Sequence, residues 1–411
     1  MTVFSRNVPL LAVCQALMMS ANTLLVATSA LVGYALASNK VYATLPFALQ
    51  LIATMCTTIP AAILMRKTGR QRGFMLATVL GMSGGSLCTL GILHGQFVIF
   101  ALGGMLLGMF NGFGNYYRFT AADIVDPAHR SRAISLVLAG GVIAAIIGPN
   151  LANLTRNLIG SANFAGSYAS IIGLYVLSLG ILSFLKLPQN SHTSKKQTDS
   201  GRPLAVIVRQ PKYIVAVICG MLGYGVMALV MTATPLAMQQ HAYPFSDTSF
   251  VIQWHVLGMY VPSFFTGHLI HRFGGIRIML LGALAGLACV AINLTGTSVT
   301  HFWIALSLLG ISWNFLFIGA TSLLTETYRQ EETFKAQAVN EFSVFSTVAI
   351  SSLSAGALQN LLGWQAVNLG AIIPLAIVLF SLLWLYTRPK TETIEQDVER
   401  DIISPVLTQP D

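Results

Sequence analysis

The chain has 411 residues, of which 55% are hydrophobic and only 9% are charged. Soluble globular proteins have roughly 25% charged residues, so this composition excludes a soluble globular chain and indicates an integral membrane protein. The formal net charge of +9 does not indicate a nucleic-acid partner, because the basic residues lie between apolar segments, where membrane topology accounts for them.

The apolar segments are long enough to cross a bilayer as helices, which takes about 20 residues each. Strand-like alternation is not seen, so we expect an all-α integral membrane fold with twelve transmembrane helices. In chain order, the expected spans are 8–34, 44–65, 73–93, 97–120, 133–155, 165–185, 213–236, 247–270, 276–296, 301–324, 337–360 and 365–387.

A basic polar segment, residues 186–212, follows the sixth expected helix and predicts a cytoplasmic loop between two six-helix halves. Its end, "PLAVIVRQPK", predicts a short interfacial helix. We therefore expect an N-terminal bundle over 1–185, a C-terminal bundle over 213–387 and a cytoplasmic tail over 388–411.

The distribution of Lys and Arg predicts the orientation. With both termini in the cytoplasm, 20 of the 23 basic residues lie on the cytoplasmic side, since only Lys40 and Arg156 fall outside and Arg118 falls within a helix. Such an excess in cytoplasmic loops is what orients membrane proteins. We expect a multi-pass protein of the cell inner (cytoplasmic) membrane, in contact with the lipid bilayer and monomeric.

The two halves repeat each other in their charged loops. "AILMRKTGRQR", residues 62–72, reappears as "GHLIHRFGGIR", residues 267–277, at an offset of 205. Asn111 and Asp123 reappear as Asn314 and Glu326, at an offset of 203. Internal repeats of this kind are typical of secondary transporters.

With these motifs the chain resembles the major facilitator superfamily (MFS). The signature of that family after the eighth helix is Gly-x-Leu-x-Asp-Arg-x-Gly-Arg-Arg, and it matches here at Gly267, Leu269, Arg272 and Gly274. The resemblance implies a bacterial-type secondary transporter with pseudo-symmetric halves, working by alternating access. The signature aspartate is replaced by Arg66 in the first half and His271 in the second, which puts the usual charge relay of the family in doubt.

The remaining charged residues of the repeat predict a cytoplasmic gate. Arg70 is expected to pair with Asp123 in the first half, and Arg272 or Arg277 with Glu326 in the second. The alternative is a set of ordinary surface ion pairs, each worth about 0–1 kcal/mol.

Candidate substrate-binding residues lie on the fourth helix. Gly104, Gly108, Asn111, Asn115 and Arg118 share one face and predict a cavity wall. Alternatively, the glycines serve tight helix packing and Arg118 reaches the membrane interface. The repeat places Thr321 opposite Arg118, so the fold does not require a charge there. The further candidates for substrate binding are Gln15, Asn22, Tyr224, Trp254 and Asn314.

Proton coupling, if present, is expected to use His255 or Glu341, because none of the 14 acids lies in the middle of an expected helix. A neutral, hydrogen-bonded His255 is the alternative for that residue. Facilitated diffusion and coupling to another ion stay open.

The sequence contains no HExxH, GxSxG or GxxxxGK[ST] motif and no Cys/His cluster, so we expect neither an enzyme nor an ATP-driven pump, and no cofactor or metal. We expect a symporter or antiporter for a small organic solute that is polar or anionic, for example an aromatic nutrient such as a vitamin. The alternatives are a drug or metabolite efflux antiporter, suggested by Gly148-Pro149, and a non-transporting membrane sensor on the same scaffold.

Overall fold

The computed structural model describes residues 6–125, 136–160, 162–185, 201–329 and 332–388, together with residues 133 and 187. These residues are almost entirely helical, as the sequence predicts. The first half holds α1 (Asn7–Leu36), η1 (Lys40–Tyr42), α2 (Leu45–Thr68), α3 (Arg70–Leu93), α4 (Phe97–Gly114), α5 (Tyr117–Asp123), α7 (Gly140–Thr155) and α8 (Ala165–Ser183). The second half holds α9 (Leu204–Val208), α10 (Pro211–Gln240), α11 (Phe245–Tyr260), α12 (Ser263–Phe273), α13 (Gly275–Thr295), α14 (Val299–Thr325) and α15 (Thr333–Thr387).

Ten helices in the described part of the chain are long and apolar enough to cross a membrane. The predicted eighth span is divided into α11 and α12 around Pro262, which has no N–H to continue the helical hydrogen bonds. The predicted eleventh and twelfth spans are joined in α15, with non-helical backbone at Gly363 (φ 79°). These two differences reconcile the ten helices with the twelve predicted spans.

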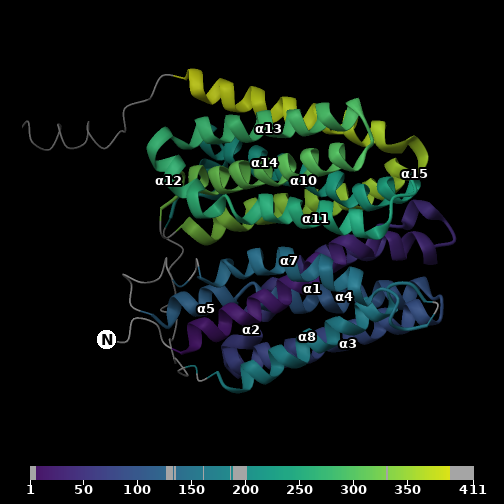
Figure 1. Cartoon of the computed structure of the whole chain (residues 1–411). Helices are drawn as coiled ribbons and strands as arrows, with labels where there is room; N and C mark the ends of the chain where they lie inside the picture. Colours follow the sequence, from purple (N-terminus) through teal and green to yellow (C-terminus); the bar gives the residue numbers. More distant parts are fainter. Residues whose placement is uncertain are drawn as a thin grey trace, which may run out of the picture.

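The helices form two stacked bundles (Figure 1), one from α1 to α8 and one from α10 to α15. Because the helices alternate in direction, α1 and α10 begin at the same end of the molecule, where α8 and α15 finish. The segment 186–212, which connects the two halves in the sequence, is called the linker. We call the end where α8 finishes and α10 begins the linker end, and the opposite end the far end. The helices α7 and α11, and likewise α2 and α15, pack across the interface between the halves.

The sequence repeat reappears in the backbone. Gly69 joins α2 to α3 with φ 88° and ψ 148°, and Gly274 joins α12 to α13 with φ 89° and ψ 143°. Positive φ of this kind is accessible to glycine and strained for other residues. The repeated signature therefore encodes the same tight helix connection in both halves.

The two halves are joined towards the far end. The Thr44 hydroxyl donates to the Leu353 carbonyl (3.1 Å), and the Ser249 hydroxyl donates to the Pro149 carbonyl (2.7 Å). The Asn150 side chain also donates to Gln253 Oε1 (2.8 Å). Among the residues that the structure describes, no hydrogen bond or ion pair joins the halves at the linker end. These hydrogen bonds therefore hold the two halves together at the far end.

The outer surface is apolar, as a lipid-facing surface must be. Large hydrophobic side chains such as Ile59, Leu154, Ile373 and Phe380 are more than 60% exposed. In water such a surface would drive aggregation, whereas in a bilayer it meets hydrocarbon. The helical architecture also satisfies the backbone polar groups internally, as the hydrocarbon region requires.

Candidate functional site

The candidate site has one charged side chain from each half. Arg118 lies on α5 of the first half and Glu341 on α15 of the second, and both side chains are exposed although protein surrounds them on most sides. They interact electrostatically, yet among the described residues no ion pair joins them. Glu341 has one hydrogen bond, from its neighbour Asn340 (3.3 Å).

An aromatic cluster lies beside this pair, in the second half. Its members are Tyr224 of α10, Tyr260 of α11, Trp313 and Phe317 of α14, and Phe345 of α15. Trp313 and Phe317 stack at 5.0 Å between ring centroids, and the Tyr224 ring meets both edge-on at 5.3 and 5.4 Å. Tyr260 interacts electrostatically with Arg118, and Tyr224 with Glu341. The cluster therefore adjoins both charges.

Three amides form a second polar group, the amide cluster, in the first half. Asn22 Oδ1 on α1 accepts hydrogen bonds from Gln50 Nε2 (3.0 Å) and from Asn111 Nδ2 (2.7 Å). The side-chain oxygens of Gln50 (Oε1) and Asn111 (Oδ1) have no hydrogen-bond partner although they are buried. Gln50 was not predicted from the sequence; the signal that could have found it is a single amide in an otherwise apolar span.

The glycines of α4 do not line a cavity. A Cβ atom at Gly108 would collide with the Gln50 carbonyl, and one at Gly104 would come within 2.9 Å of the Pro46 carbonyl. The backbones of α2 and α4 therefore touch at these positions. The glycines on this face of α4 serve tight helix packing, which was the alternative to a cavity wall. This close approach also places Gln50 next to Asn111.

Asn314 serves the scaffold rather than a ligand. Its Nδ2 donates to the Met259 carbonyl and to Ser263 Oγ (2.6 Å each), and its Oδ1 accepts from Thr266 Oγ1 (2.5 Å). All three partners surround the break between α11 and α12. Because both of its polar atoms are occupied and it is fully buried, the structure does not favour the predicted substrate contact.

His255 and Trp254 also lie away from the charged pair. His255 is fully buried between α11 and α14, with Nδ1 at 2.9 Å from the Leu306 carbonyl. This is the hydrogen-bonded alternative for His255, although its Nε2 has no hydrogen-bond partner among the described residues. Trp254 is 39% exposed and meets Phe250 and Trp303. The structure therefore favours neither residue as part of the site.

The remaining two candidates are Gln15 and Asn115. Among the described residues, neither side chain has a hydrogen bond that indicates its role. Gln15 on α1 is buried, and its Oε1 has no hydrogen-bond partner. Asn115 follows α4 directly and is half-buried, three residues before Arg118.

The predicted gate residues form ion pairs within each half. Arg70 Nη2 lies 2.6 Å from Asp123 Oδ2, as the repeat suggests. Glu326, however, pairs with Lys212 at 2.9 Å and not with Arg272 or Arg277. Lys212 begins α10 and approaches Glu326 more directly than the two arginines, which lie over the rings of Phe273 and Tyr386. Both ion pairs are largely solvent-exposed and therefore worth about 0–1 kcal/mol.

A buried carboxylate at the linker end was not predicted. Glu332, at the start of α15, accepts from Arg202 Nε (2.8 Å) and Nη2 (2.7 Å), and from the Arg202 backbone N–H (2.8 Å). The Arg202 guanidinium, hydrogen-bonded to it, lowers the pKa of Glu332 to about 2. Arg202 also donates to the Thr327 carbonyl (3.0 Å). These contacts attach the end of the linker, including α9, to the second half.

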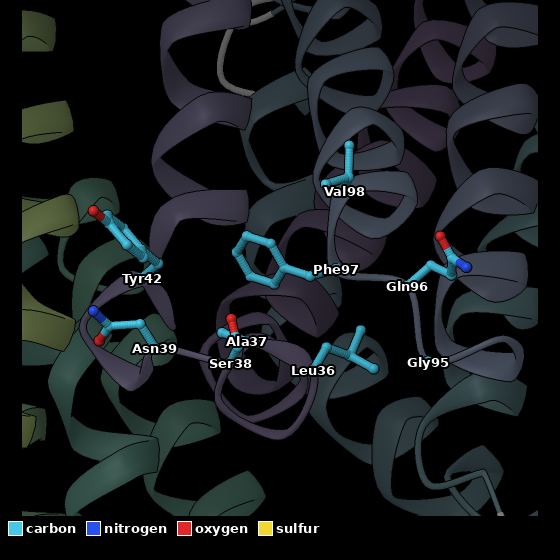
Figure 2. A pocket seen from close by; sticks show the side chains of 9 residues that line it. All are labelled: Leu36, Ala37, Ser38, Asn39, Tyr42, Gly95, Gln96, Phe97 and Val98. Atoms are coloured by element: carbon cyan, nitrogen blue, oxygen red, sulfur yellow. The ribbon is translucent and has the colours of Figure 1, made fainter.

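A shallow pocket of about 350 Å³ lies at the far end (Figure 2), between the connections that follow α1 and α3. Phe97, Leu36 and Tyr42 supply much of its wall, with Asn39 and Gln96 as polar groups, and no charged residue lines it. Since Asn39 already accepts from the Val41 backbone, this pocket lacks the convergent polar groups expected of a substrate site.

Comparisons with known proteins agree with this architecture. The sequence model described as Major Facilitator Superfamily matches residues 11–333 and 216–410. The chain is 40% identical over 394 residues to the riboflavin transporter RfnT of Brucella anthropi, covering 96% of this chain and 99% of that protein. It is 26% identical over 380 residues to the uncharacterized MFS-type transporter YdeG of Bacillus subtilis, covering 86% of each.

Two solved structures share the fold. A mutant of the nucleoside transporter NupG gives a TM-score of 0.71 at 11% identity, over 92% of this chain and 100% of that one. The xylose transporter XylE from E. coli, in a partially occluded inward open conformation, gives 0.68 at 13% identity, over 95% and 100%. At these identities the likeness shows the fold alone. The chain therefore belongs to the major facilitator superfamily, and it is a multi-pass membrane transporter of small solutes rather than an enzyme.

Proposed function

We propose that this protein carries riboflavin, or another flavin with the same ring system, across the cytoplasmic membrane by alternating access. The observation that carries the proposal is the 40% identity to a riboflavin transporter, which extends over nearly the full length of both chains. An alignment over 96% of this chain includes the helices of both halves.

The chemistry of the site supports a flavin. The isoalloxazine ring of riboflavin is flat and aromatic, and the aromatic cluster offers ring faces and edges of the kind that stack on it. The ring carbonyls accept hydrogen bonds, for which Arg118 is a strong donor. The hydroxyls of the ribityl chain both donate and accept, which suits Glu341 and the amide cluster. We therefore assign substrate binding to Arg118, Glu341, Asn22, Asn111 and Tyr224, with Gln15 and Asn115 at its border, and add Gln50.

The direction in which the site opens follows from the proposed topology. If the linker end is cytoplasmic, as the basic residues indicate, then the closed far end faces outward and this conformation is inward-facing. The ion pairs Arg70–Asp123 and Lys212–Glu326 each stay within one half here. As a cytoplasmic gate, they would exchange partners when the linker ends of the halves approach each other.

Glu341 is also the group we propose for proton coupling. It is the carboxylate that faces the space between the halves, within electrostatic range of Arg118. Binding or loss of a proton there would change the balance of charge in the site, whereas His255 is fully buried and hydrogen-bonded to the Leu306 carbonyl. A pH gradient would then drive transport through Glu341 and not through His255.

The direct test is a titration of the purified protein with riboflavin, followed by quenching of flavin fluorescence. We expect saturable binding by the wild type, and binding weakened about tenfold or more by Arg118→Ala, since a hydrogen bond from a charged group contributes roughly 1.5–3 kcal/mol. Arg209→Ala is the matched control, because Arg209 is exposed at the end of α9.

Two results would contradict the proposal. The first is a wild-type protein that binds amino acids, organic acids or cationic drugs in preference to riboflavin. The second is an Arg118→Ala protein that binds riboflavin as tightly as the Arg209→Ala protein does, which would remove Arg118 from the site.

A further inference from the structure

One amide of the first half is held in a fixed orientation by two others. Asn22 Oδ1 on α1 accepts from Gln50 Nε2 of α2 (3.0 Å) and from Asn111 Nδ2 of α4 (2.7 Å). A carbonyl oxygen has two lone pairs, so both are occupied. Gln50 is 3% exposed and Asn111 is 6% exposed. Rotation of the Asn22 amide would break these buried hydrogen bonds, which is costly.

The polar atom of Asn22 that remains is its Nδ2. Among the described residues this nitrogen donates to no group, and it does not belong to the buried atoms that lack a partner. Because Asn22 as a whole is half-buried, Nδ2 lies on the accessible side of the residue. The unpaired oxygens of the amide cluster, Gln50 Oε1 and Asn111 Oδ1, are buried. On its accessible side the cluster therefore presents a hydrogen-bond donor and no acceptor.

The contacts of α1 place this donor inside the protein. The Thr23 hydroxyl donates to the Ala144 carbonyl of α7 (2.9 Å). The Thr28 hydroxyl donates to the Tyr168 hydroxyl of α8 (3.2 Å). At 3.6 residues per turn, the two threonines lie about 100° and about 120° to either side of Asn22, which therefore faces away from α7 and α8. Since α1 also packs against α10 and α11 of the second half, the donor faces the interior and not lipid.

The amide cluster adjoins the contact between the halves. Leu51, which follows Gln50 on α2, packs against a core cluster of the second half. Tyr224 and Phe317 of the aromatic cluster pack against the same residues, which are Ala228, Val344 and Val348. The helix α2 therefore links the amide cluster to the aromatic rings that we assign to flavin binding.

We propose that Asn22 is a specificity-determining donor that binds a carbonyl or hydroxyl oxygen of the substrate through Nδ2, and that Gln50 and Asn111 are positioning residues that act through it. This inference rests on the proposed riboflavin function and deepens it. Riboflavin has carbonyl oxygens on its ring and hydroxyl oxygens on its ribityl chain. A donor held in place by supporting hydrogen bonds loses little freedom when such an oxygen binds.

The test compares the dissociation constants of riboflavin and of lumiflavin, which has the ring without the ribityl chain, for the full-length protein. Asn22→Asp keeps the shape of the side chain and an oxygen for Gln50 and Asn111, and it replaces the donor by an acceptor. We expect riboflavin binding about tenfold weaker than in the wild type. An equal loss for lumiflavin assigns the bound oxygen to the ring, and an unchanged lumiflavin affinity assigns it to the ribityl chain.

A double-mutant cycle tests the positioning role. Gln50→Leu releases one side of the Asn22 amide and should weaken riboflavin binding about threefold. In the Asn22→Asp protein both oxygens accept, so the orientation of the side chain no longer matters and Gln50→Leu should have no further effect. A merely structural role of Gln50 would give the same loss of affinity in both backgrounds.

Controls separate the lost donor from added charge. Asn22→Leu removes the donor without adding charge and should also weaken riboflavin binding, and it replaces Asn22→Asp if that variant does not fold. Asn157→Asp is the matched control, because Asn157 is exposed beyond α7 and its Oδ1 accepts from Arg156 Nε (3.4 Å). The same substitution there should leave the affinity unchanged.

The outcomes are distinct. If the wild type binds riboflavin and Asn22→Asp binds it equally tightly, the donor role of Asn22 is overturned while the riboflavin function stands. Equal losses from Gln50→Leu in both backgrounds overturn the positioning role. A wild type that binds neither flavin overturns the proposed function and this inference together.

Discussion

Asn111 and Asn314 occupy equivalent positions of the sequence repeat but have different environments. Asn314 has its amide fully engaged by Met259, Ser263 and Thr266. Asn111 donates to Asn22 and leaves its carbonyl oxygen without a partner. One asparagine therefore stabilises a helix break, whereas the other belongs to the proposed substrate site. The repeat preserves the residue type and does not preserve its role.

This difference predicts unequal effects on stability. Asn314→Ala leaves buried groups around the α11–α12 break without partners, which costs about 1–3 kcal/mol. Asn111→Ala, the matched control, removes one hydrogen bond and should cost roughly 1 kcal/mol or less. The difference in stability is measured by comparing the thermal unfolding temperatures of the two purified variants. An Asn314→Ala protein as stable as the Asn111→Ala protein would contradict the scaffold role.

At the residue scale, the sequence predicts Arg118 for the site because its repeat position holds Thr321, and it predicts the Arg70–Asp123 ion pair, which the structure contains. It does not predict the hydrogen bond of Gln50 to Asn22, or that His255 is buried against α14. A polar residue in an apolar span indicates a buried partner. Whether that partner is a neighbouring helix or a ligand depends on the rotation of the helix and on its tilt, which hydropathy does not determine.

At the element scale, the linker ends in a clamp formed by Arg202 and Glu332. The helix α9 forms where the sequence predicts an interfacial helix, and its Leu204 and Val206 are exposed while Ile207 is buried. The clamp itself could not be predicted, because it joins residues 130 positions apart through a carboxylate that the loop buries completely. It fixes the end of the linker to the second half.

The clamp predicts how the linker responds to mutation and to pH. Arg202→Ala or Glu332→Gln should increase amide hydrogen exchange over residues 201–210, with Arg209→Ala as the control. Since the hydrogen bond from the Arg202 guanidinium lowers the pKa of Glu332 from 4.5 to about 2, the clamp stabilises the folded state fully above about pH 4.5 and loses this effect as the pH falls through about 2. Exchange that changes between pH 5 and 8 through Glu332 would contradict this.

At the scale of the whole molecule, the fold was largely predictable. Twelve apolar spans, a basic central segment and matched loop motifs lead to the two-bundle transporter that the family relationship confirms. The conformation was not predictable, because it depends on contacts between halves, such as Thr44 with Leu353 and Asn150 with Gln253. Contacts between segments so far apart in the chain leave no local pattern in the sequence.

Under the proposed inward-facing topology, the same contacts would keep the substrate from leaving through the far end. Hydrogen bonds close the far end, while the linker end has none between the halves among the described residues. Alternating access requires that these far-end contacts break when the linker end closes. A neutral ligand that contacts Arg118 in one half and Glu341 in the other would favour the approach of the halves, and so couple binding to closure.

Uptake of radiolabelled riboflavin into proteoliposomes, with and without an imposed pH gradient, tests the central claim most directly. We predict saturable uptake that a pH gradient accelerates, that Arg118→Ala and Glu341→Gln impair, and that Arg209→Ala leaves intact. Equal uptake by liposomes with and without the protein would contradict the claim that this transporter carries riboflavin. Gradient-driven uptake that persists in Glu341→Gln would contradict the coupling role of Glu341.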